Sequence, residues 1–299
     1  MIISASRRTD IPAFYAPWFI HRIRAGFCTV PNPFNPAQVS HVSLLPADVD
    51  VIVFWTRNPR PLFPYLDELD QRGYYYYFQY TLLDYPRPLE TSTPRLPAAL
   101  HTFRQLSHRL GPQRLIWRYD PILLTPRTPV QFHLDRYRQI AQALEGCTRR
   151  SVISLHDLYP KTKKRLAALK DHGLEILDPQ ALPADQLAEL LTGLAAIAHQ
   201  HGLEIFSCAE TLDLAPYGIQ PGKCIDDDYI HRTFGLQVSS QKDPSQRQAC
   251  GCVVSRDIGM YDTCLFGCSY CYATTSFTRA RRRYTHHNPL SPSLVGWHE

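Results

Sequence analysis

Segments typical of strands and of helices alternate through the first two thirds of this 299-residue chain. Strand-length runs of apolar, β-branched or aromatic residues are found at 2–5, 49–55, 75–80, 115–119, 151–155 and 203–207. Helical patterns are found at 13–25, 62–71, 96–110, 130–144, 162–171 and 183–200. Such alternation predicts an α/β fold with parallel strands and right-handed crossovers. Six units predict an open parallel (β/α)6 barrel that is TIM-barrel-like, with a complete eight-fold barrel as the alternative.

Polar residues follow most of the predicted strands. In parallel barrels the carboxyl ends of the strands carry the active site, so these residues are candidates for catalysis or substrate binding. The catalytic candidates are Arg7, Arg8, Asp10, Arg118, Asp120, His156 and Glu210. The arginines suit a carboxylate or phosphate, and the acidic residues and the histidine suit ribose contacts or proton transfer. Each could also be an ordinary loop residue; Asp10 before Ile11 and Pro12 could simply cap the first helix.

The nine cysteines are unevenly distributed, because Cys28 and Cys147 stand alone and seven more fall between Cys208 and Cys271. The start of the chain has no cationic segment followed by an apolar run, and no stretch of 18 apolar residues occurs. We therefore expect a cytoplasmic protein without a signal peptide and with no membrane contact. In a reducing compartment the clustered cysteines indicate metal ligation rather than disulfides.

Three of these cysteines have a C-x3-C-x2-C spacing at Cys264, Cys268 and Cys271. Structural zinc sites and electron-transfer clusters normally take four protein ligands. A local set of three predicts a [4Fe–4S] cluster with one iron open to a small molecule.

The motif, with aromatic Tyr270 before its last cysteine, resembles that of the radical S-adenosylmethionine superfamily, and especially its spore photoproduct lyase branch. The resemblance implies that S-adenosylmethionine binds the open iron and that the reduced cluster cleaves it to a 5′-deoxyadenosyl radical, which acts on the substrate. It also implies a reducing partner such as flavodoxin or ferredoxin, and it places Tyr270 near the adenine. In that superfamily the motif follows the first strand, whereas here it follows the sixth. The glycine-glycine-glutamate signature that holds the cofactor after the second strand is replaced by a segment containing Arg57 and Asn58, which become the cofactor-binding candidates.

Both ends of the chain resemble a bacterial family of unknown function, numbered 1848. The likeness is carried by the opening Ser-x-Arg-Arg-Thr-Asp-Ile-Pro and by the closing Cys-Gly-Cys, Asp-Ile-Gly and Cys-x3-Cys-x2-Cys-Tyr-Ala. The family implies no particular activity.

The remaining clustered cysteines add up to one further ligand set: Cys208, Cys224, Cys250 and Cys252. Four thiolates could hold a second [4Fe–4S] cluster or a tetrahedral zinc ion. Two other interpretations are a catalytic thiol at Cys208 and buried free thiols without a role.

After residue 210 the alternation stops, and the acidic run 226–228 and the polar stretch 239–248 are predicted to be loop or linker. We expect a partial barrel over 1–235 and a cysteine-rich iron–sulfur segment over 236–299.

The basic run 278–284, followed by His286 and His287, could bind a nucleic acid, although short basic tails are more often solvated faces. The function expected is therefore a radical S-adenosylmethionine-type enzyme acting on a small or nucleotide-like substrate. The alternatives are a zinc or electron-transfer protein with other chemistry, and a nucleic-acid repair or modification protein.

Overall fold

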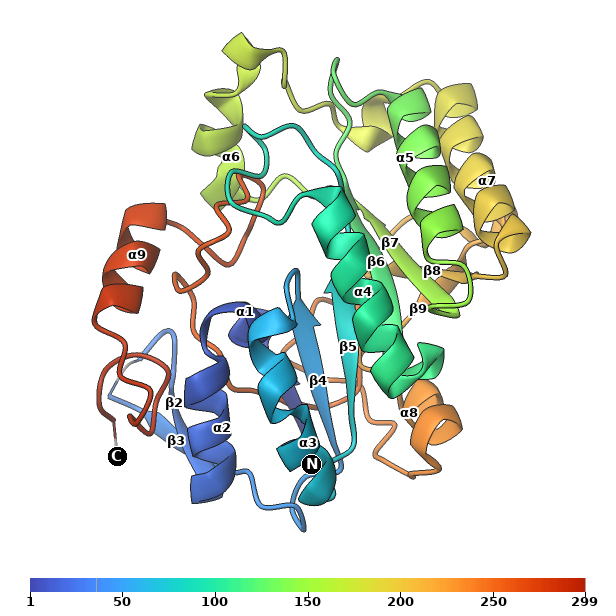
Figure 1. Cartoon of the computed structure of the whole chain (residues 1–299). Helices are drawn as coiled ribbons and strands as arrows, with labels where there is room; N and C mark the ends of the chain where they lie inside the picture. The colour runs from blue at the N-terminus through green and yellow to red at the C-terminus, as the bar shows by residue number, and fades with distance from the viewer. Residues whose placement is uncertain (36, 299) are drawn as a thin grey trace.

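A computed structural model of the chain describes residues 1–35 and 37–298. Glu299, the last residue of the predicted cysteine-rich segment, lies outside the described residues. The dominant element is an eight-stranded sheet in which every neighbouring pair of strands is parallel (Figure 1). Its order is β10 (Arg256–Asp257), β1 (Ile2–Ala5), β4 (Val51–Thr56), β5 (Tyr76–Thr81), β6 (Leu115–Ile122), β7 (Arg150–Leu155), β8 (Glu204–Cys208) and β9 (Gln220–Gly222). The strands β9 and β10 form opposite edges of this sheet, so the described strands make an open, TIM-barrel-like sheet and no closed barrel.

All six strands that the sequence predicts are present in this sheet, as β1, β4, β5, β6, β7 and β8. The prediction of an α/β fold with parallel pairing is therefore confirmed. The strands are continuous apolar runs because a parallel sheet is covered on both faces. The edge strands β9 and β10 were not predicted. They contain three and two residues, which is too short for a periodic pattern.

Helices follow the strands as the alternation predicts. They are α1 (Ile11–Phe14), α2 (Ala16–Ala25), α3 (Leu66–Gln71), α4 (Leu96–Leu110), α5 (Val130–Ala143), α6 (Pro160–Ala167) and α7 (Ala184–Gln200). Short 3-10 turns lie at Arg60–Tyr65, Pro112–Arg114, Lys170–His172, Pro179–Ala181 and Ala215–Tyr217. The single predicted helix at 13–25 is two helices that meet at Tyr15, and α2 ends at Gly26 in a left-handed conformation with φ of 78°.

Besides the two edge strands, the sequence-based prediction missed three elements and misread a fourth. An antiparallel pair, β2 (Phe27–Pro31) and β3 (Val39–Ser43), lies outside the main sheet. Helix α9 (Phe277–Thr285) contains the basic run. The acidic run predicted as loop or linker instead begins helix α8 (Asp227–Phe234), because the Asp226 side chain accepts a hydrogen bond from the Tyr229 amide at 3.1 Å and caps the helix.

The two faces of the sheet are covered by different parts of the chain. One face packs on helices, with Phe19 of α2 and Phe103 of α4 among the buried contacts. The opposite face packs on α8 and on the segments on either side of it, which include Cys224, Cys250 and Cys252 (Figure 1, orange). Three of the seven clustered cysteines are therefore buried on the face that a barrel would enclose, and Cys208 packs against them. The boundary at 235/236 stays a prediction. No helix in the described ranges is long and apolar enough to cross a membrane.

Candidate metal and ligand site

A cavity of about 430 Å³ lies at the carboxyl ends of the strands. Residues after β1, at the end of β4, in β6 and after β7 and β8 contribute to its wall, together with the segment that follows β10. All seven clustered cysteines line it. The other predicted site residues on its wall are Arg7, Arg8, Asp10, Arg57, Arg118, Asp120, His156 and Tyr270. The fold thus brings chain segments more than 200 residues apart to one cavity, as parallel strands with a common carboxyl edge allow.

Two predicted residues do not contribute to this wall. The Glu210 carboxylate accepts a hydrogen bond from the Leu155 amide at 2.8 Å, and burial raises its pKa to about 7. Asn58 lies in the turn after β4, where its side-chain oxygen accepts from the Arg60 amide at 3.3 Å. Through these hydrogen bonds to backbone amides, both residues stabilise the loops around the cavity.

The first cysteine set, Cys264, Cys268 and Cys271, lies on the loop between β10 and α9. The backbone of this loop is joined to residues 89–92. The Ser269 amide donates to the Leu89 carbonyl at 2.9 Å, and the Ser92 amide donates to the Phe266 carbonyl at 3.0 Å. The cysteines are therefore fixed against the connection between β5 and α4 rather than hanging free at the end of the chain.

Arg165 of α6 holds the other side of the same loop. Its guanidinium donates to the carbonyl oxygens of Cys271 at 2.6 Å and Ser269 at 3.2 Å, and also to that of Thr274. One side chain thus satisfies three carbonyls of an irregular segment that has few regular backbone partners. The sequence analysis did not single out Arg165, since nothing in a helix of basic residues marks one of them as an anchor.

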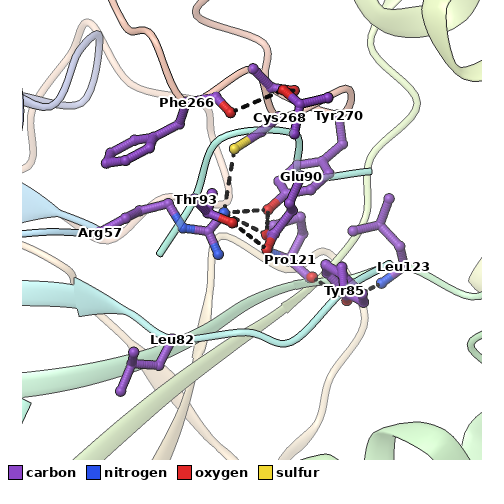
Figure 2. A network of polar contacts seen from close by, with 12 residues as sticks. Arg57, Leu82, Tyr85, Glu90, Thr93, Pro121, Leu123, Phe266, Cys268 and Tyr270 are labelled. Carbon is purple, nitrogen blue, oxygen red and sulfur yellow. Dashed lines mark hydrogen bonds and ion pairs between the residues drawn. The ribbon is translucent and has the colours of Figure 1, made fainter. Parts of the chain in front are cut away.

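A buried polar network joins the end of β4 to the first cysteine set (Figure 2). Nη1 of Arg57 donates to a Glu90 carboxylate oxygen at 2.5 Å and to the Tyr270 hydroxyl at 2.8 Å, and it lies 3.3 Å from the Cys268 sulfur. Tyr270 and Thr93 both donate to the Glu90 carboxylate. Burial lowers the pKa of Arg57, but the Glu90 carboxylate, together with Tyr270 and Cys268, outweighs this effect and holds it well above the ordinary value.

Glu90 is 2% exposed and stands at the centre of this network, yet the sequence analysis missed it. It lies in an irregular, proline-containing segment, and its partner Arg57 is 33 residues earlier. No periodic pattern connects the two residues, so only the folded chain shows that they form an ion pair.

Burial also determines the protonation of the first cysteine set. It raises the pKa of Cys268 to about 12, against the lowering effect of Arg57, and it raises the pKa of Cys264 well above its ordinary value. Without a further positive charge these two thiols are neutral at pH 7. A coordinated metal supplies such a charge and deprotonates the thiol.

The second cysteine set, Cys208, Cys224, Cys250 and Cys252, lies across the cavity on the inner face of the sheet. The Cys208 and Cys224 sulfurs are 2.9 Å apart, and Cys252 contacts both Cys224 and Cys250. The hydrogen bond from Cys224, helped by the charge of Arg118, lowers the pKa of Cys208 against the effect of burial.

Two guanidinium groups lie beside the second set. Nη1 of Arg118 lies 2.9 Å from the Cys224 sulfur, and its Nε donates to Asp120 at 3.0 Å. Arg7 and Arg118 both lie over the Trp55 ring, at 5.2 and 5.1 Å from its centroid. Trp55 was not among the candidates because its place in an apolar strand gave no reason to separate it from the core.

Several buried polar atoms on the cavity wall have no hydrogen-bond partner among the described residues. They are Nη2 of Arg7, Oγ1 of Thr9, Nε1 of Trp55, Nε of Arg57 and both ring nitrogens of His156. In the rest of the described chain only Nε of Arg22 and of Arg150 share this condition. Buried polar groups are nearly always paired with protein or water, so their concentration at one cavity indicates a place for a polar ligand.

His156 illustrates this arrangement. The side chain is 6% exposed, and burial lowers its pKa to about 4 despite the nearby Asp157 and Asp120 carboxylates. The ring is therefore neutral at pH 7 and can donate one hydrogen bond and accept another.

The remaining predicted residues of the β1 loop have contacts of their own. Asp10 caps α1 by accepting from the Ala13 amide at 2.9 Å, and it also accepts from the Arg57 amide at 2.6 Å. The Arg8 guanidinium lies over the Tyr261 ring at 5.2 Å. Asp257 of β10, which the sequence analysis did not include, accepts from the Ser6 hydroxyl at 2.7 Å and from the Arg7 amide at 2.8 Å.

Two arginines of the basic run form contacts within the protein. Arg279 pairs with Asp262 at 3.0 Å, and Arg283 donates to the Tyr261 carbonyl at 2.5 Å. Arg281 and Arg282 are exposed. His287 donates through Nδ1 to the Leu294 carbonyl at 2.8 Å, and His286 contacts the Arg282 carbonyl. The helix therefore anchors the cysteine loop with one side and presents charge on the other.

Residues 2–273 match the family described as Domain of unknown function (DUF1848), and the chain belongs to this family. No curated protein matches the sequence. Among solved structures, L-hydantoinase (dihydropyrimidinase) from Arthrobacter aurescens is 12% identical over 55% of this chain and 34% of that one, with a TM-score of 0.25. This chain thus spans about a third of the hydantoinase. A candidate alpha-L-fucosidase from Bacteroides thetaiotaomicron is 12% identical over 81% and 82% of the two chains, with a TM-score of 0.27. Similarities this low carry no argument about activity.

Proposed function

We propose that this protein is an iron–sulfur enzyme in which Cys264, Cys268 and Cys271 hold a [4Fe–4S] cluster with one iron open to S-adenosylmethionine. The observation that carries the proposal is their position on the wall of a cavity that also holds unpartnered, buried polar atoms. A metal group and a polar ligand would then share one enclosed space. A purely structural metal site has no need of such a cavity.

The donor set fits a cluster better than a single metal ion. In a tetrahedral zinc site with Zn–S bonds of about 2.3 Å, the sulfurs lie about 3.8 Å apart. Among the described residues, Asp226, Asp227 and Asp228 are the one group of potential ligands whose atoms all lie within 4.8 Å of each other. The three cysteine sulfurs are therefore more widely spread than one ion requires.

The acidic group itself supports no metal site. Asp226 pairs with Arg150 at 2.7 Å and caps α8, and Asp227 pairs with Lys223 at 2.7 Å. These contacts give both carboxylates structural partners.

A cluster held by Cys264, Cys268 and Cys271 would supply one electron at low potential to S-adenosylmethionine. Residues of the chain would tune the reduction potential of such a cluster. Arg57 places a positive charge and a hydrogen-bond donor 3.3 Å from the Cys268 sulfur, and hydrogen bonds to the sulfurs are one determinant of a cluster's reduction potential. Glu90 and Tyr270 fix the position of that guanidinium.

The same cavity would hold the rest of the ligand and the substrate. Its volume of about 430 Å³ lies within the usual range of small-molecule sites, about 300–1,000 Å³. Arg7 and Trp55 offer unpartnered donors, and neutral His156 offers a donor and an acceptor. This set favours an acceptor-rich small or nucleotide-like substrate. In the cytoplasm a flavodoxin or ferredoxin would supply the electron.

Anaerobic reconstitution with iron and sulfide tests the proposal. We expect an EPR signal of the dithionite-reduced protein that changes when S-adenosylmethionine is added, together with formation of 5′-deoxyadenosine. Cys264→Ala, Cys268→Ala and Cys271→Ala should each abolish the response. Cys147→Ala is the matched control, because Cys147 is a cysteine outside the cavity wall. A signal that S-adenosylmethionine leaves unchanged, without the nucleoside, would contradict the proposal, as would zinc in place of iron.

A further inference from the structure

Two sulfurs of the second cysteine set are in direct contact. Those of Cys208 and Cys224 lie 2.9 Å apart. Sulfurs that share one zinc ion, with Zn–S bonds of about 2.3 Å, lie about 3.8 Å apart in a tetrahedral site. The pair is therefore closer than a shared metal ion allows, whereas a small displacement would bring it to the S–S bond length of about 2.0 Å.

The backbone of β8 and β9 is built for this contact. Cys208 is the last residue of β8, and its partner in the register of β9 is Gly222. An added Cβ atom at Gly222 would lie 2.5 Å from the Ser207 carbonyl oxygen, so a larger residue would push the two strands apart. Directly after Cys208 the chain is left-handed at Ala209, with a φ of 54°. Such conformations are unfavourable for a residue with a side chain, and they are concentrated at functional sites.

The two cysteines differ in their access to the cavity. Cys224 is buried, and its carbonyl accepts hydrogen bonds from the Gln79 side chain at 2.6 Å and from the Tyr77 hydroxyl at 3.0 Å. Cys208 is only half-buried, and it lies on the cavity wall. A small molecule in the cavity therefore reaches the sulfur of Cys208 more readily than that of Cys224.

The two thiols also differ in their protonation. The hydrogen bond from Cys224, together with the charge of Arg118, lowers the pKa of Cys208 to about 7 against the effect of burial. Hydrogen bonds with Cys208 and Cys252, together with burial, raise the pKa of Cys224 well above its ordinary value. Since the thiolate is the nucleophile in disulfide exchange, the more accessible cysteine is also the more reactive one.

Cys252 lies beside the inner thiol of this pair. Hydrogen bonds from Cys224 and Cys250 lower the pKa of Cys252. The charge of Arg7 and the Ile225 amide, which donates to the Cys252 sulfur at 3.4 Å, add to this effect. The Cys252 sulfur can therefore accept the proton of Cys224.

We propose that Cys208 and Cys224 form a redox-active dithiol that reduces a small disulfide in the cavity. The Cys208 thiolate attacks one sulfur of that disulfide, whose S–S bond breaks, so that one half leaves as a thiolate and the other half stays on Cys208 as a mixed disulfide. Cys224 then attacks the Cys208 sulfur, its proton passes to Cys252, and the second half leaves as a thiolate. The substrate has gained two electrons and becomes two thiols, while the chain has lost two electrons and holds a Cys208–Cys224 disulfide. A dithiol reductant restores the pair by the reverse exchange.

This proposal goes beyond the proposed function, which concerns the three-cysteine set. It requires neither iron nor S-adenosylmethionine, so the two proposals can fail separately. An EPR signal that S-adenosylmethionine leaves unchanged would contradict only the proposed function, and an inert Cys208–Cys224 pair would contradict only the dithiol.

Peptide mapping of the full chain tests the dithiol. The protein is equilibrated without oxygen in mixtures of hydroxyethyl disulfide and 2-mercaptoethanol, alkylated with iodoacetamide, and digested with trypsin. Cleavage after lysine and arginine places Cys208 on peptide 171–223 and Cys224 on peptide 224–232. We expect mass spectrometry to find these two peptides joined by a disulfide at high ratios of disulfide to thiol, and separate again in excess thiol.

Single variants establish the order of attack. Cys224→Ser should accumulate the mercaptoethanol mixed disulfide on Cys208, because the thiol that resolves it is missing. Cys208→Ser should prevent the bond and leave Cys224 largely unmodified. Cys147→Ser is the matched control, because Cys147 lies outside the cavity wall, and it should leave the joined peptides unchanged.

The wild-type result needs no substitution, so a variant that fails to fold does not decide the test. Absence of the joined peptides at every ratio of disulfide to thiol would overturn the proposal. So would a mixed disulfide that forms on Cys224 and not on Cys208, or bound zinc or iron that must be removed by a chelator before either peptide reacts.

Discussion

Nη1 of Arg57 lies 3.3 Å from the Cys268 sulfur, although the two residues are 211 positions apart in the chain. The same nitrogen is ion-paired with buried Glu90. One end of the network is thus the carboxyl end of β4, and the other is the cysteine loop (Figure 2). This contact makes the stability of the sheet and the chemistry of the cysteine loop depend on the same few side chains.

Glu90→Gln should destabilise the protein strongly, because it leaves the Arg57 charge buried beside Cys268 without its carboxylate. Breaking a buried ion pair by removing one partner costs about 3–5 kcal/mol. The free energy of unfolding in urea measures the effect. Asp135→Asn is the control, since its pair with Arg138 is exposed and such pairs contribute about 0–1 kcal/mol. Equal losses of unfolding free energy in the two variants would show that the buried Arg57–Glu90 pair contributes no more to stability than an exposed pair.

Gly267→Ala should displace the cysteine loop. Gly267 has a φ of 68°, and an added Cβ atom would lie 2.1 Å from the Thr91 hydroxyl oxygen. We expect a loss of stability above the ~1–2 kcal/mol of the left-handed conformation alone, and weaker iron binding by the first set. Iron content and urea unfolding give the two measurements.

Gly146→Ala is the matched control for the loop variant, because Gly146 has a φ of 73° and nothing within 4 Å of its added Cβ. The double variant Thr91→Ala/Gly267→Ala should recover part of the loss. If Gly267→Ala costs no more than Gly146→Ala, the close approach to Thr91 does not fix the loop.

Arg165→Met should loosen the loop without unfolding the sheet. The guanidinium satisfies carbonyls at Ser269, Cys271 and Thr274, and the substitution leaves them unpaired. Hydrogen exchange of residues 264–275 should accelerate about tenfold or more, since the loss of about 1.5–3 kcal/mol is expected for hydrogen bonds to a charged group. Lys164→Met, an exposed neighbour on the same helix, should leave the exchange unchanged. Unaltered exchange in Arg165→Met would rule out its role as the anchor.

The stability of the protein should fall between pH 6.5 and pH 4 in part because of His156. Burial lowers its folded pKa to about 4, below the ordinary value of 6.5, so the unfolded chain binds a proton that the folded chain does not. The stability is complete above pH 6.5 and is lost as the pH falls to 4, by up to about 3 kcal/mol from this residue.

His156→Gln isolates that contribution, because buried His133, whose pKa burial also lowers to about 4, is present in both proteins. We expect a flatter dependence of the unfolding free energy on pH in the variant. Parallel curves for the variant and the wild-type chain would mean that His156 is not buried in its neutral form.

The sequence predicts the sheet better than it predicts the site's connections. The strands β1, β4, β5, β6, β7 and β8 are recognisable because burial on both faces demands continuous apolar runs. The residues after them could be expected to meet for the same topological reason. By contrast, Glu90 and Arg165 act through contacts with distant segments, and no local pattern records such contacts. Arg118 was recognised as a site residue, but only the structure shows that its guanidinium lies beside Cys224.

The pairing of β10 with β1 has a consequence for synthesis of the protein. Ser6 and Asp257, joined at 2.7 Å, are 251 residues apart, so the outer side of β1 has no partner while most of the chain is being made. A ribosome adds about 5–20 residues each second, and the delay is therefore on the order of tens of seconds. During that time the loop carrying Arg7 and Arg8 lacks the carboxylate that later orders it. In the proposed enzyme, a cluster at the three-cysteine set would therefore form only after Cys271 has been made, and a chain that stops before Cys271 would not hold it.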